Sequence, residues 1–442
     1  MPQGVLNFSI EATDERLTPR AGIALFGEYI KAIRLDRLIE EYLPQPRSNH
    51  GYTPFGIMQP LLLMLHSGGR VLEDLRSIKA DKALQEILKI DKVPTSDTIG
   101  KWLKRHSEAG LAGMVSLNRT LTARYLKDKN TEPLVLDIDA TVIESHKSIA
   151  WMTYKMFPGF TPIVGHINGG YLIHSEFRKG NVAPADGNLE FVQQCQGQLP
   201  KDKTINFLRA DSASYQAELF NYCEANGIVF TIGGHLDSSV WRNIREITDW
   251  KPLISKKGTA HILKEEVAEF IHTMEHTHKA FRMIVVKKTV TPMLDGMEQF
   301  LTEEEMLALA SEHYSVIATN AEAQTMTAQD VVSFYRKRGD TSENRIKELK
   351  NGFNLSYLPT SHFGANAFYF AIGTLAYNLF ILFKETLRKS WQRHTIQTLR
   401  YKLYHIAGKV VTHARQTVLK VNEEFTQLLN AIRQKSYEIW LE

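Results

Sequence analysis

Two aspartates lie where apolar strands are expected to end, and acids in such positions are candidates for chemistry. Asp139 is at the C-terminal edge of a strand predicted at residues 134–141, and Asp211 ends a strand predicted at 204–211. A carboxylate in an otherwise apolar strand is costly unless it is paired or bound to a metal. Asp137 shares a strand face with Asp139, because side chains two residues apart point the same way, and it is an alternative first acid. These carboxylates are candidate metal ligands, with hydrogen bonds to loop amides as the structural alternative.

A basic stretch over residues 334–350 offers a third acid. From residue 341 onward it predicts a helix capped by Thr341 or Ser342. Three charged residues then recur at helical spacing on one face: Glu343, Lys347 and Lys350. Such a stripe could hold a metal through its carboxylate and phosphates through its ammonium groups. The alternative is an exposed helix held by Glu–Lys pairs.

Two aspartates and a glutamate together form an oxygen-rich ligand set of the kind that Mg²⁺ or Mn²⁺ prefers. Two such ions roughly 3.5–4 Å apart would stabilise both the attacking and the leaving oxygen in a displacement at phosphorus. Asp139, Asp211 and Glu343 are therefore the candidate catalytic and metal-binding residues, and phosphoryl transfer is the candidate chemistry.

The composition is that of an ordinary globular protein and excludes several other classes. The chain has 442 residues, 43% hydrophobic and 23% charged, with a net charge of +4 and two cysteines. That length predicts two to four domains, and two cysteines provide neither a disulfide framework nor a zinc site. The N-terminus does not resemble a signal peptide. The most apolar window, residues 367–383, is interrupted by polar residues, so we expect a buried core helix in a cytoplasmic protein.

The pattern of expected elements predicts an α/β fold whose catalytic core is interrupted by an inserted subdomain. Strands in antiparallel order, with a hairpin at 168–170, are followed by strands that alternate with helices. A helix at 264–278 is expected inside the insertion. The predicted parts are a helical DNA-binding region at 1–130, a core at 131–232 and 313–360, an inserted subdomain at 233–312, and a helical basic C-terminal region at 361–442.

Two basic segments could contact DNA. A short helix at 96–106, with Ser96 as its expected cap, follows a tight turn and presents Lys101, Lys104 and Arg105 outward, as a helix-turn-helix reader does. Any small amphipathic helix also has a charged face, which is the alternative. Residues 384–420 carry nine Lys or Arg against one acid, with aromatic residues between them.

These motifs together resemble insertion-sequence transposases of the Asp-Asp-Glu, retroviral-integrase-like superfamily. The resemblance spans roughly residues 20–380 and is strongest for the branch with a Tyr-Arg-Glu-Lys signature and a β-rich insertion. The matching motifs are Leu136-Asp137-Ile138-Asp139-Ala140-Thr141, Leu208-Arg209-Ala210-Asp211-Ser212, and the helix with Tyr335, Arg338, Glu343 and Lys350. The resemblance implies a ribonuclease-H-like core.

The resemblance also implies residue roles. Asp139, Asp211 and Glu343 would bind two divalent ions, and Asp139 is preferred over Asp137 because the family's first acid has a Thr two positions on, as Thr141 is here. Tyr335, Arg338 and Lys350, with Lys347 beside them, would hold DNA phosphates. The interval from Arg338 to Glu343 is one residue longer than the family pattern, so we expect a bulge there, with Glu348 or Asp340 as a substitute acid otherwise.

The implied activity is Mg²⁺-dependent cutting and joining of element ends, in which water and then a DNA 3′-hydroxyl are the nucleophiles. The partners would be double-stranded DNA (terminal inverted repeats and target) and a second protomer in a synaptic homodimer, in a nucleoid-associated protein that engages no membrane. Trp241 or Trp250 would stack on a flipped base, or pack in the core. The rival functions are a nuclease on the same core that cannot join strands, and a catalytically degenerate or domesticated DNA-binding protein.

Overall fold

A computed structural model describes residues 5–441 except residues 7, 48–50, 128, 130–131, 254–261, 292–301 and 415. The side chains of residues 303, 307, 340 and 341 also lie outside the description. The chain forms two compact units, one of Met1–Leu117 with Glu348–Glu442 and one of Asn118–Lys347.

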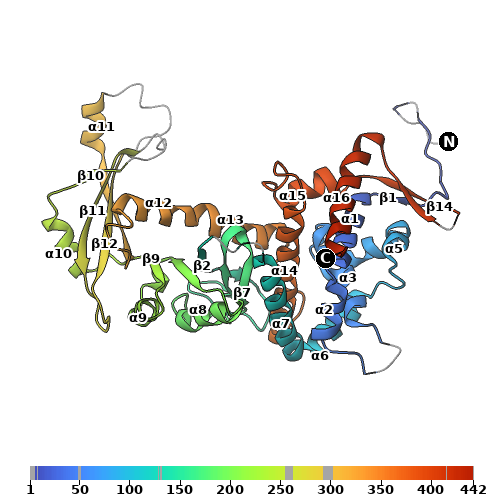
Figure 1. Ribbon diagram of the computed structural model, residues 1–442, viewed down its shortest axis with the longest axis horizontal. Coiled ribbons are helices and arrows are strands. Elements are labelled where there is room, and N and C mark those ends of the chain that lie inside the picture. The colour runs from blue at the N-terminus through green and yellow to red at the C-terminus, as the bar shows by residue number, and fades with distance from the viewer. Residues whose placement is uncertain are drawn as a thin grey trace. The chain divides into compact units, whose positions relative to one another are not determined.

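The second unit is built on a nine-stranded sheet with the order β10-β11-β12-β13-β9-β8-β2-β6-β7 (Figure 1). Five of its strands confirm the predicted alternation: β2 (Leu134–Ala140), β6 (Ile163–His166), β7 (Leu172–Glu176), β8 (Ile205–Ala210) and β9 (Val229–Gly233). β2 is antiparallel to β6, and β6 to β7, whereas β8 is parallel to both β2 and β9. The carboxyl ends of β2 and β8 therefore meet at one edge of the sheet.

Antiparallel strands continue the sheet beyond β9: β10 (Lys251–Pro252), β11 (Ile262–His272), β12 (Phe281–Val290) and β13 (Ser311–Thr319). The prediction of a helix at 264–278 is wrong, because most of that segment forms β11. Its helix-forming glutamates are paired across the sheet instead, Glu266 with Lys287 at 3.0 Å and Glu265 with Lys288 at 3.4 Å. Cross-strand pairs of opposite charge stabilise a strand that local propensity does not favour.

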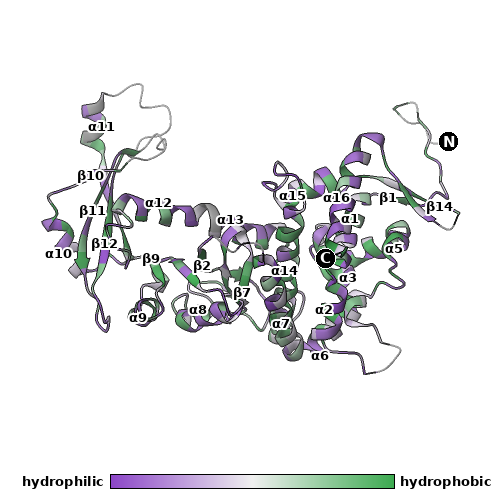
Figure 2. Cartoon of the chain, in the orientation of Figure 1, coloured by the Kyte–Doolittle hydropathy of each residue, from purple (hydrophilic) through white to green (hydrophobic). Residues whose placement is uncertain are grey.

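Helices pack on this sheet: α8 (Asn188–Gly197), α9 (Ala217–Ala225), α10 (Ser238–Glu246) and α12 (Ala328–Arg338). Thr327 caps α12 by accepting from the amide of Asp330. Val331 and Val332 are buried against the apolar side chains of β11, β12 and β13, while other residues of α12 are hydrophilic (Figure 2). α12 runs from these outer strands towards β2 (Figure 1), so it carries its last residues to the edge where Asp139 lies.

A small second sheet follows β2 directly, with the order β3-β5-β4. Its strands are β3 (Ile143–Glu144), β4 (Trp151–Met152) and β5 (Pro158–Phe160). Further elements of the unit are η2 (Asn168–Gly170), η3 (Ser212–Ser214), α11 (Glu303–Leu309), the π-helical turn η5 (Gly339–Glu343) and α13 (Asn344–Lys347).

The first unit is mainly helical and encloses a long apolar helix, α14 (Phe363–Glu385). α14 is the one helix of the described residues that is long and apolar enough to cross a membrane, and 94% of its most apolar window is buried inside the protein. This burial matches the expected core helix. The N-terminal helices are α1 (Ala21–Ala32), α2 (Leu35–Tyr42), α3 (Pro54–His66), η1 (Leu72–Asp74), α4 (Leu75–Ala80), α5 (Lys82–Leu88), α6 (Ser96–Arg105) and α7 (Ser107–Leu126).

The C-terminal part of this unit differs from the helical region that was predicted. It contains the hairpin β14 (Gly408–His413) and β15 (Gln416–Lys420), and β14 pairs with β1 (Leu17–Thr18). The alternating polar and β-branched residues of β14, Lys-Val-Val-Thr-His, suit a pleated strand better than a helix. The remaining elements are η6 (Glu348–Gly352), α15 (Ile396–Leu399), η7 (Arg400–Tyr404) and α16 (Glu423–Leu441).

Candidate active site

The parallel pairing of β2 and β8 places Asp139 and Asp211 at the same edge of the sheet. Asp137 lies opposite Arg209 in the register, and Asp139 and Asp211 each follow two residues later. The side chain of Asp139 is 14% exposed and that of Asp211 is 44% exposed. Asp211 also begins η3, where its Oδ1 accepts from the amide of Ala213 at 3.1 Å. The strand-end positions predicted for both acids are thus brought together by the sheet.

Arg338, the last residue of α12, reaches both aspartates. Its Nη2 is 3.2 Å from Oδ1 of Asp139 and 4.0 Å from Oδ2 of Asp211. Even so, the pKa of Asp139 is raised to about 6. Burial is the main cause, and the negative charges of Asp211 and Glu343 raise the pKa further, while Arg338 and the hydroxyl of Ser342 lower it. Burial therefore outweighs the effect of the Arg338 guanidinium on Asp139, and two further carboxylates add negative charge nearby.

A π-helical turn, η5, connects Arg338 to Glu343. In a regular α-helix two residues five apart point about 140° away from each other, but a π turn hydrogen-bonds residues five apart and aligns them. The bulge expected from the long Arg338–Glu343 interval is present at this place. The predicted cap at Thr341 or Ser342 is wrong, since the chain is already helical from Ala328. Ser342 is instead fully buried.

Glu343 is exposed yet close enough to the sheet edge to raise the pKa of Asp139. Across the described residues, no three His, Cys, Asp or Glu side chains lie together as a ready metal-binding group. Arg338 occupies the space between the two aspartates, so the three acids are neighbours without converging as one ligand set. The oxygen donors and their uncompensated negative charge nevertheless fit a hard divalent cation, which prefers carboxylate oxygens.

Asp137, the alternative first acid, has a full set of partners. Its two oxygens accept from Nε and Nη2 of Arg209, both at 2.7 Å, and neither side chain is more than 6% exposed. Arg209 also donates to the carbonyl of Phe334 at 2.8 Å and lies over its ring. This pair ties β2 and β8 to α12, which makes Asp137 a structural acid. Sequence reasoning missed the pairing, although Arg209 stands in one of the motifs.

The other predicted phosphate-binding residues are placed differently from one another. Tyr335 lies beside Arg338 and both aspartates. Burial is the main cause that raises the pKa of its phenol, the aspartates raise this pKa further, and Arg338 lowers it. Its hydroxyl packs against Gly233, where a Cβ atom would come within 2.8 Å. Lys347 is exposed at the end of α13. Lys350 belongs to η6 of the first unit and is half-buried.

The two substitute acids are not better candidates than Glu343. Oε1 of Glu348 accepts from the amide of Ile396 at 2.7 Å within the first unit, so this carboxylate has a structural partner. The side chain of Asp340 lies outside the described residues.

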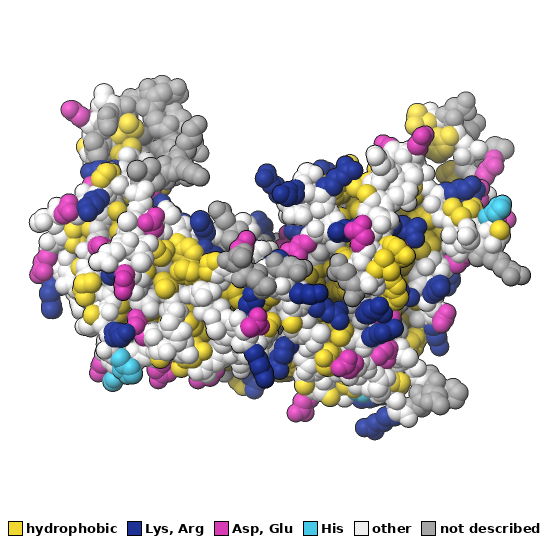
Figure 3. All heavy atoms as spheres, in the orientation of Figure 1, with side chains coloured by type: hydrophobic (Ala, Val, Ile, Leu, Met, Phe, Trp, Pro, Cys, Tyr) yellow, Lys and Arg dark blue, Asp and Glu magenta, His cyan; other side chains and the backbone are white. Residues whose placement is uncertain are grey.

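The predicted DNA-reading helix is present as α6, with one change. Its cap is Thr95, whose hydroxyl accepts from the amide of Thr98, instead of the predicted Ser96. Trp102 is buried and packs on Phe368, with ring centroids 4.9 Å apart. Lys101, Lys104 and Arg105 are all exposed. Lys and Arg side chains also gather over the part of this unit that carries α15 (Figure 3), within the predicted basic segment.

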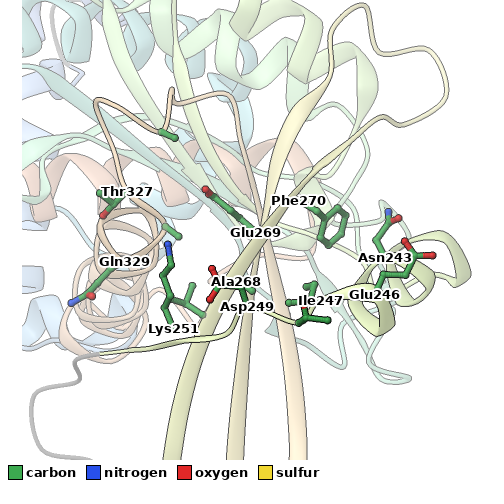
Figure 4. A pocket seen from close by; sticks show the side chains of 14 residues that line it. Asn243, Glu246, Ile247, Asp249, Lys251, Ala268, Glu269, Phe270, Thr327 and Gln329 are labelled. Atoms are coloured by element: carbon green, nitrogen blue, oxygen red, sulfur yellow. The ribbon is translucent and has the colours of Figure 1, made fainter.

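Trp241 and Trp250 are half-buried, and both rings pack against Tyr314 at centroid distances of 5.2 and 6.1 Å. The Nζ atom of Lys287 lies 4.4 Å from the ring centroid of Trp250. A nearby cavity of about 820 Å³, between α10, β10, β11 and α12, is lined by Asp249, Glu269, Phe270 and others but by none of the three acids (Figure 4). These contacts give both tryptophans a packing role in this part of the sheet.

Paired acids at the ends of parallel strands, with a basic helix across them, fit the class of enzymes that act on phosphodiesters. Comparison with protein families narrows this class: residues 5–435 match the model of the Transposase DDE domain group 1. The chain therefore belongs to the DDE transposase family, and its substrate is DNA. A search of curated proteins finds no match.

Proposed function

We propose that the protein is a DNA transposase that cleaves and joins element ends by Mg²⁺- or Mn²⁺-dependent phosphoryl transfer in cut-and-paste transposition. The observation that carries the proposal is the electrostatic coupling of Asp139 to both Asp211 and Glu343 around Arg338. Two aspartates share one arginine, and Glu343 adds a third negative charge near Asp139; a divalent cation would balance this excess.

The proposed core is ribonuclease-H-like and consists of residues 131–232 and 313–360, with an inserted subdomain at 233–312. Support comes from the strand order β7-β6-β2-β8-β9, with three antiparallel strands followed by two parallel ones. The strands β10 to β12 of the proposed insertion extend the same sheet from its β9 side through β13. The flanking regions 1–130 and 361–442 would bind DNA.

In this proposal each group near the cut has a defined task. Asp139, Asp211 and Glu343 would hold the ions, which supply charge neutralisation at the reacting phosphate. Arg338 and Tyr335, next to the aspartates, would bind the phosphate oxygens, because a guanidinium and a phenol donate the hydrogen bonds that these oxygens accept. Lys347, with Lys350 further along the chain, would neutralise the neighbouring phosphates. The chain's part is thus positioning and charge stabilisation.

The reaction needs no nucleophilic side chain, since water and a 3′-hydroxyl would attack the phosphodiesters. Two protomers would hold two ends in a synaptic homodimer, in a nucleoid-associated, cytoplasmic setting. Joining of ends to a target separates this function from a nuclease on the same core, and cleavage separates it from a degenerate DNA-binding copy.

The test uses the full chain and labelled duplexes made from the genomic DNA that flanks its coding sequence. We expect cleavage and strand transfer with Mg²⁺ or Mn²⁺ and neither with EDTA. Asp139→Asn, Asp211→Asn and Glu343→Gln are each expected to abolish cleavage while leaving affinity for the duplex within a small factor. Asp249→Asn, an exposed acid away from the site, is the matched control. Cleavage without transfer would support the nuclease, and binding without cleavage by the unaltered chain would support the degenerate copy.

A further inference from the structure

The hairpin of β4 and β5 rises from the chain directly after the first acid. β3 begins three residues after Ala140, the end of β2, and pairs with β5, while Trp151 of β4 lies opposite Gly159 of β5. The base of the hairpin is tightly packed: a Cβ atom on Gly180 would come within 2.3 Å of the Gly159 carbonyl oxygen and 2.4 Å of that of Trp151. The hairpin is thus fixed at its base, close to Asp139 in the chain.

The tip of the hairpin holds a conformation that costs free energy. Met156 has a φ of 63°, in the left-handed region, which costs a non-glycine residue about 1–2 kcal/mol. Thr153 maintains the turn, since both its amide and its hydroxyl donate to the carbonyl of Phe157, at 3.0 and 2.7 Å. The backbone of the tip is therefore held in a defined turn.

The side chains presented at this tip are apolar, aromatic and exposed. Trp151, Met152, Tyr154 and Met156 are 49%, 57%, 51% and 81% exposed. Single exposed apolar residues are normal, but four within six residues are an unusual concentration that suggests a binding surface. We call residues 151–156 the hairpin tip.

Lysines accompany both aromatic rings. The Nζ atom of Lys179 lies 5.5 Å from the ring centroid of Trp151, and that of Lys155 lies 5.8 Å from the ring centroid of Tyr154. Exposed aromatic faces with cations beside them are the chemistry by which proteins bind single-stranded nucleic acid, because bases stack on the rings and phosphates meet the ammonium groups.

Tyr154 also lies within electrostatic reach of the candidate active site. Burial is the main cause that raises the pKa of its phenol, and the carboxylates of Asp139 and Asp211 raise it further. By contrast, Trp241 and Trp250 are half-buried against Tyr314. Among these aromatic residues, Tyr154 combines exposure with closeness to the acids, and Trp151 lies on the same hairpin.

We propose that the hairpin tip stacks on unpaired bases at the DNA end next to the phosphodiester held at Asp139 and Asp211, with Trp151 and Tyr154 as the positioning residues. The inference rests on the proposed function, and it names the form of DNA that the site takes: a duplex whose terminal bases are separated.

The first experiment compares Trp151→Ala/Tyr154→Ala with the unaltered chain on two substrates, a fully paired end and an end with three mismatched terminal pairs. We expect the double variant to cleave the paired end roughly tenfold more slowly, because stacking no longer offsets the cost of unpairing, and the mismatched end within about twofold of the unaltered chain. Ile271→Ala, which removes an apolar side chain of β11 that is 68% exposed, is the matched control. Equal rates for variant and unaltered chain on the paired end, or an equal loss on both ends, would overturn the inference.

The second experiment does not need cleavage and so separates the two proposals. Binding of a fluorescent single-stranded oligonucleotide is measured with EDTA present, by anisotropy. We expect the double variant to bind roughly tenfold more weakly, Trp151→Phe to bind normally, and Ile271→Ala to be unaffected. If the unaltered chain does not cleave but this pattern holds, the proposed function fails and the hairpin tip remains a single-strand site. Unchanged single-strand affinity, or a change in oligomeric state with no change in affinity, would contradict the hairpin assignment.

Discussion

The sheet of the second unit contains two aspartate–arginine arrangements that start two residues apart on β2 and differ in their balance of charge. Asp137 and Arg209 form two hydrogen bonds of 2.7 Å in a dry setting. Asp139 meets Arg338 at 3.2 Å, with Asp211 at 4.0 Å from the same guanidinium, and its pKa is raised to about 6. One arrangement is electrically complete, and the other has more negative charge than its arginine balances.

This difference separates an acid that holds the fold, Asp137, from one that is a candidate for chemistry, Asp139. A buried pair with every donor and acceptor used offers nothing to a ligand, and losing either member strands a charge in the interior. A group whose pKa is strongly perturbed by burial and by like charges, at the edge of a sheet, is instead a functional-site candidate. Residue type and position in the strand do not separate Asp137 from Asp139, but their partners do.

The largest effect that would test this comparison is on folding. We expect Asp137→Ala to lower the free energy of unfolding by about 3–5 kcal/mol, because Arg209 would remain buried and charged. Urea denaturation followed by circular dichroism measures this change. The double variant Asp137→Leu/Arg209→Met removes both charges and is expected to recover most of the loss. A single variant as stable as the unaltered chain would show that the pair contributes nothing, and the comparison would fail.

A surplus of positive charge on α6 allows the second test. Lys101, Lys104 and Arg105 are exposed, so replacing all three with Ala is expected to leave folding unchanged. If each contacts a phosphate, the slope of log affinity against log salt falls by up to about 0.9 per residue, and affinity at low salt falls roughly tenfold or more. Anisotropy titrations of an end-containing duplex at several salt concentrations measure both quantities. Replacement of Lys201, Arg242 and Arg245 by Ala, at exposed positions outside the proposed DNA-binding regions, is a control of the same charge. An unaltered slope in the α6 variant would remove this helix from DNA binding.

The third effect is a smaller change in the free energy of unfolding. Replacement of Asp139 is expected to raise this free energy, whereas replacement of Asp137 is expected to lower it. The carboxyl of Asp139 has its pKa raised from 3.8 to about 6, so the folded state holds its proton more tightly than the unfolded state does. The stability of the unaltered chain without metal is therefore expected to fall as pH rises from about 4 to about 6 through this group. Asp139→Asn has no carboxyl to ionise at this position. It is therefore expected to be more stable than the unaltered chain at pH 7 by about 1–2 kcal/mol, after allowance for the lost contact with Arg338.

Chemical denaturation of both proteins in EDTA at pH 4, 5, 6 and 7 measures the difference. Asp249→Asn, at an exposed acid, should follow the unaltered chain. An Asp139→Asn variant that is less stable than the unaltered chain at pH 7 would mean that the ion pair with Arg338 outweighs burial and repulsion. Asp139 would then stabilise the fold as Asp137 does, and the contrast between them would fail.

Much of the fold could be predicted from local sequence, because the information lies within each segment. Apolar runs bounded by turn residues identify β2, β6, β8 and β9, and the Thr327 capping box and apolar spacing identify α12. β11 was assigned as a helix because its Glu and Ala residues favour helices, while the lysines that pair with Glu265 and Glu266 lie on another strand. Such cross-strand information is not local, so the segment alone does not contain it.

The same distinction applies to the site. Asp139 and Asp211 could be identified because strand ends are visible in sequence, and the extra residue between Arg338 and Glu343 could be seen as a departure in spacing. The partner of Asp137 could not be assigned, since it depends on the register between β2 and β8. The nearness of Tyr154 to the acids could not be predicted either, because the course of the chain after β2 decides it and no periodic pattern marks the hairpin tip.

The smallest expected effect concerns Gly339, the residue at the start of the π turn that connects Arg338 to Glu343. Its backbone is helical, with φ −57° and ψ −46°, and a Cβ atom there would meet nothing within 4 Å. Gly339→Ala is therefore expected to raise the free energy of unfolding by about 0.5–1 kcal/mol, since glycine loses more backbone entropy in a helix than alanine does. Cleavage should stay within about twofold of the unaltered chain.

Deletion of Gly339 tests the spacing more directly, because it leaves Arg338 and Glu343 four residues apart, on one face of a regular helix. If the π turn only accommodates the extra residue, the deletion variant cleaves within roughly tenfold of the unaltered chain, whereas insertion of an Ala after Gly339 abolishes cleavage. Full activity of the insertion variant would show that the alignment of Glu343 with Arg338 does not matter, and the excess charge around Asp139 would then need only Asp211.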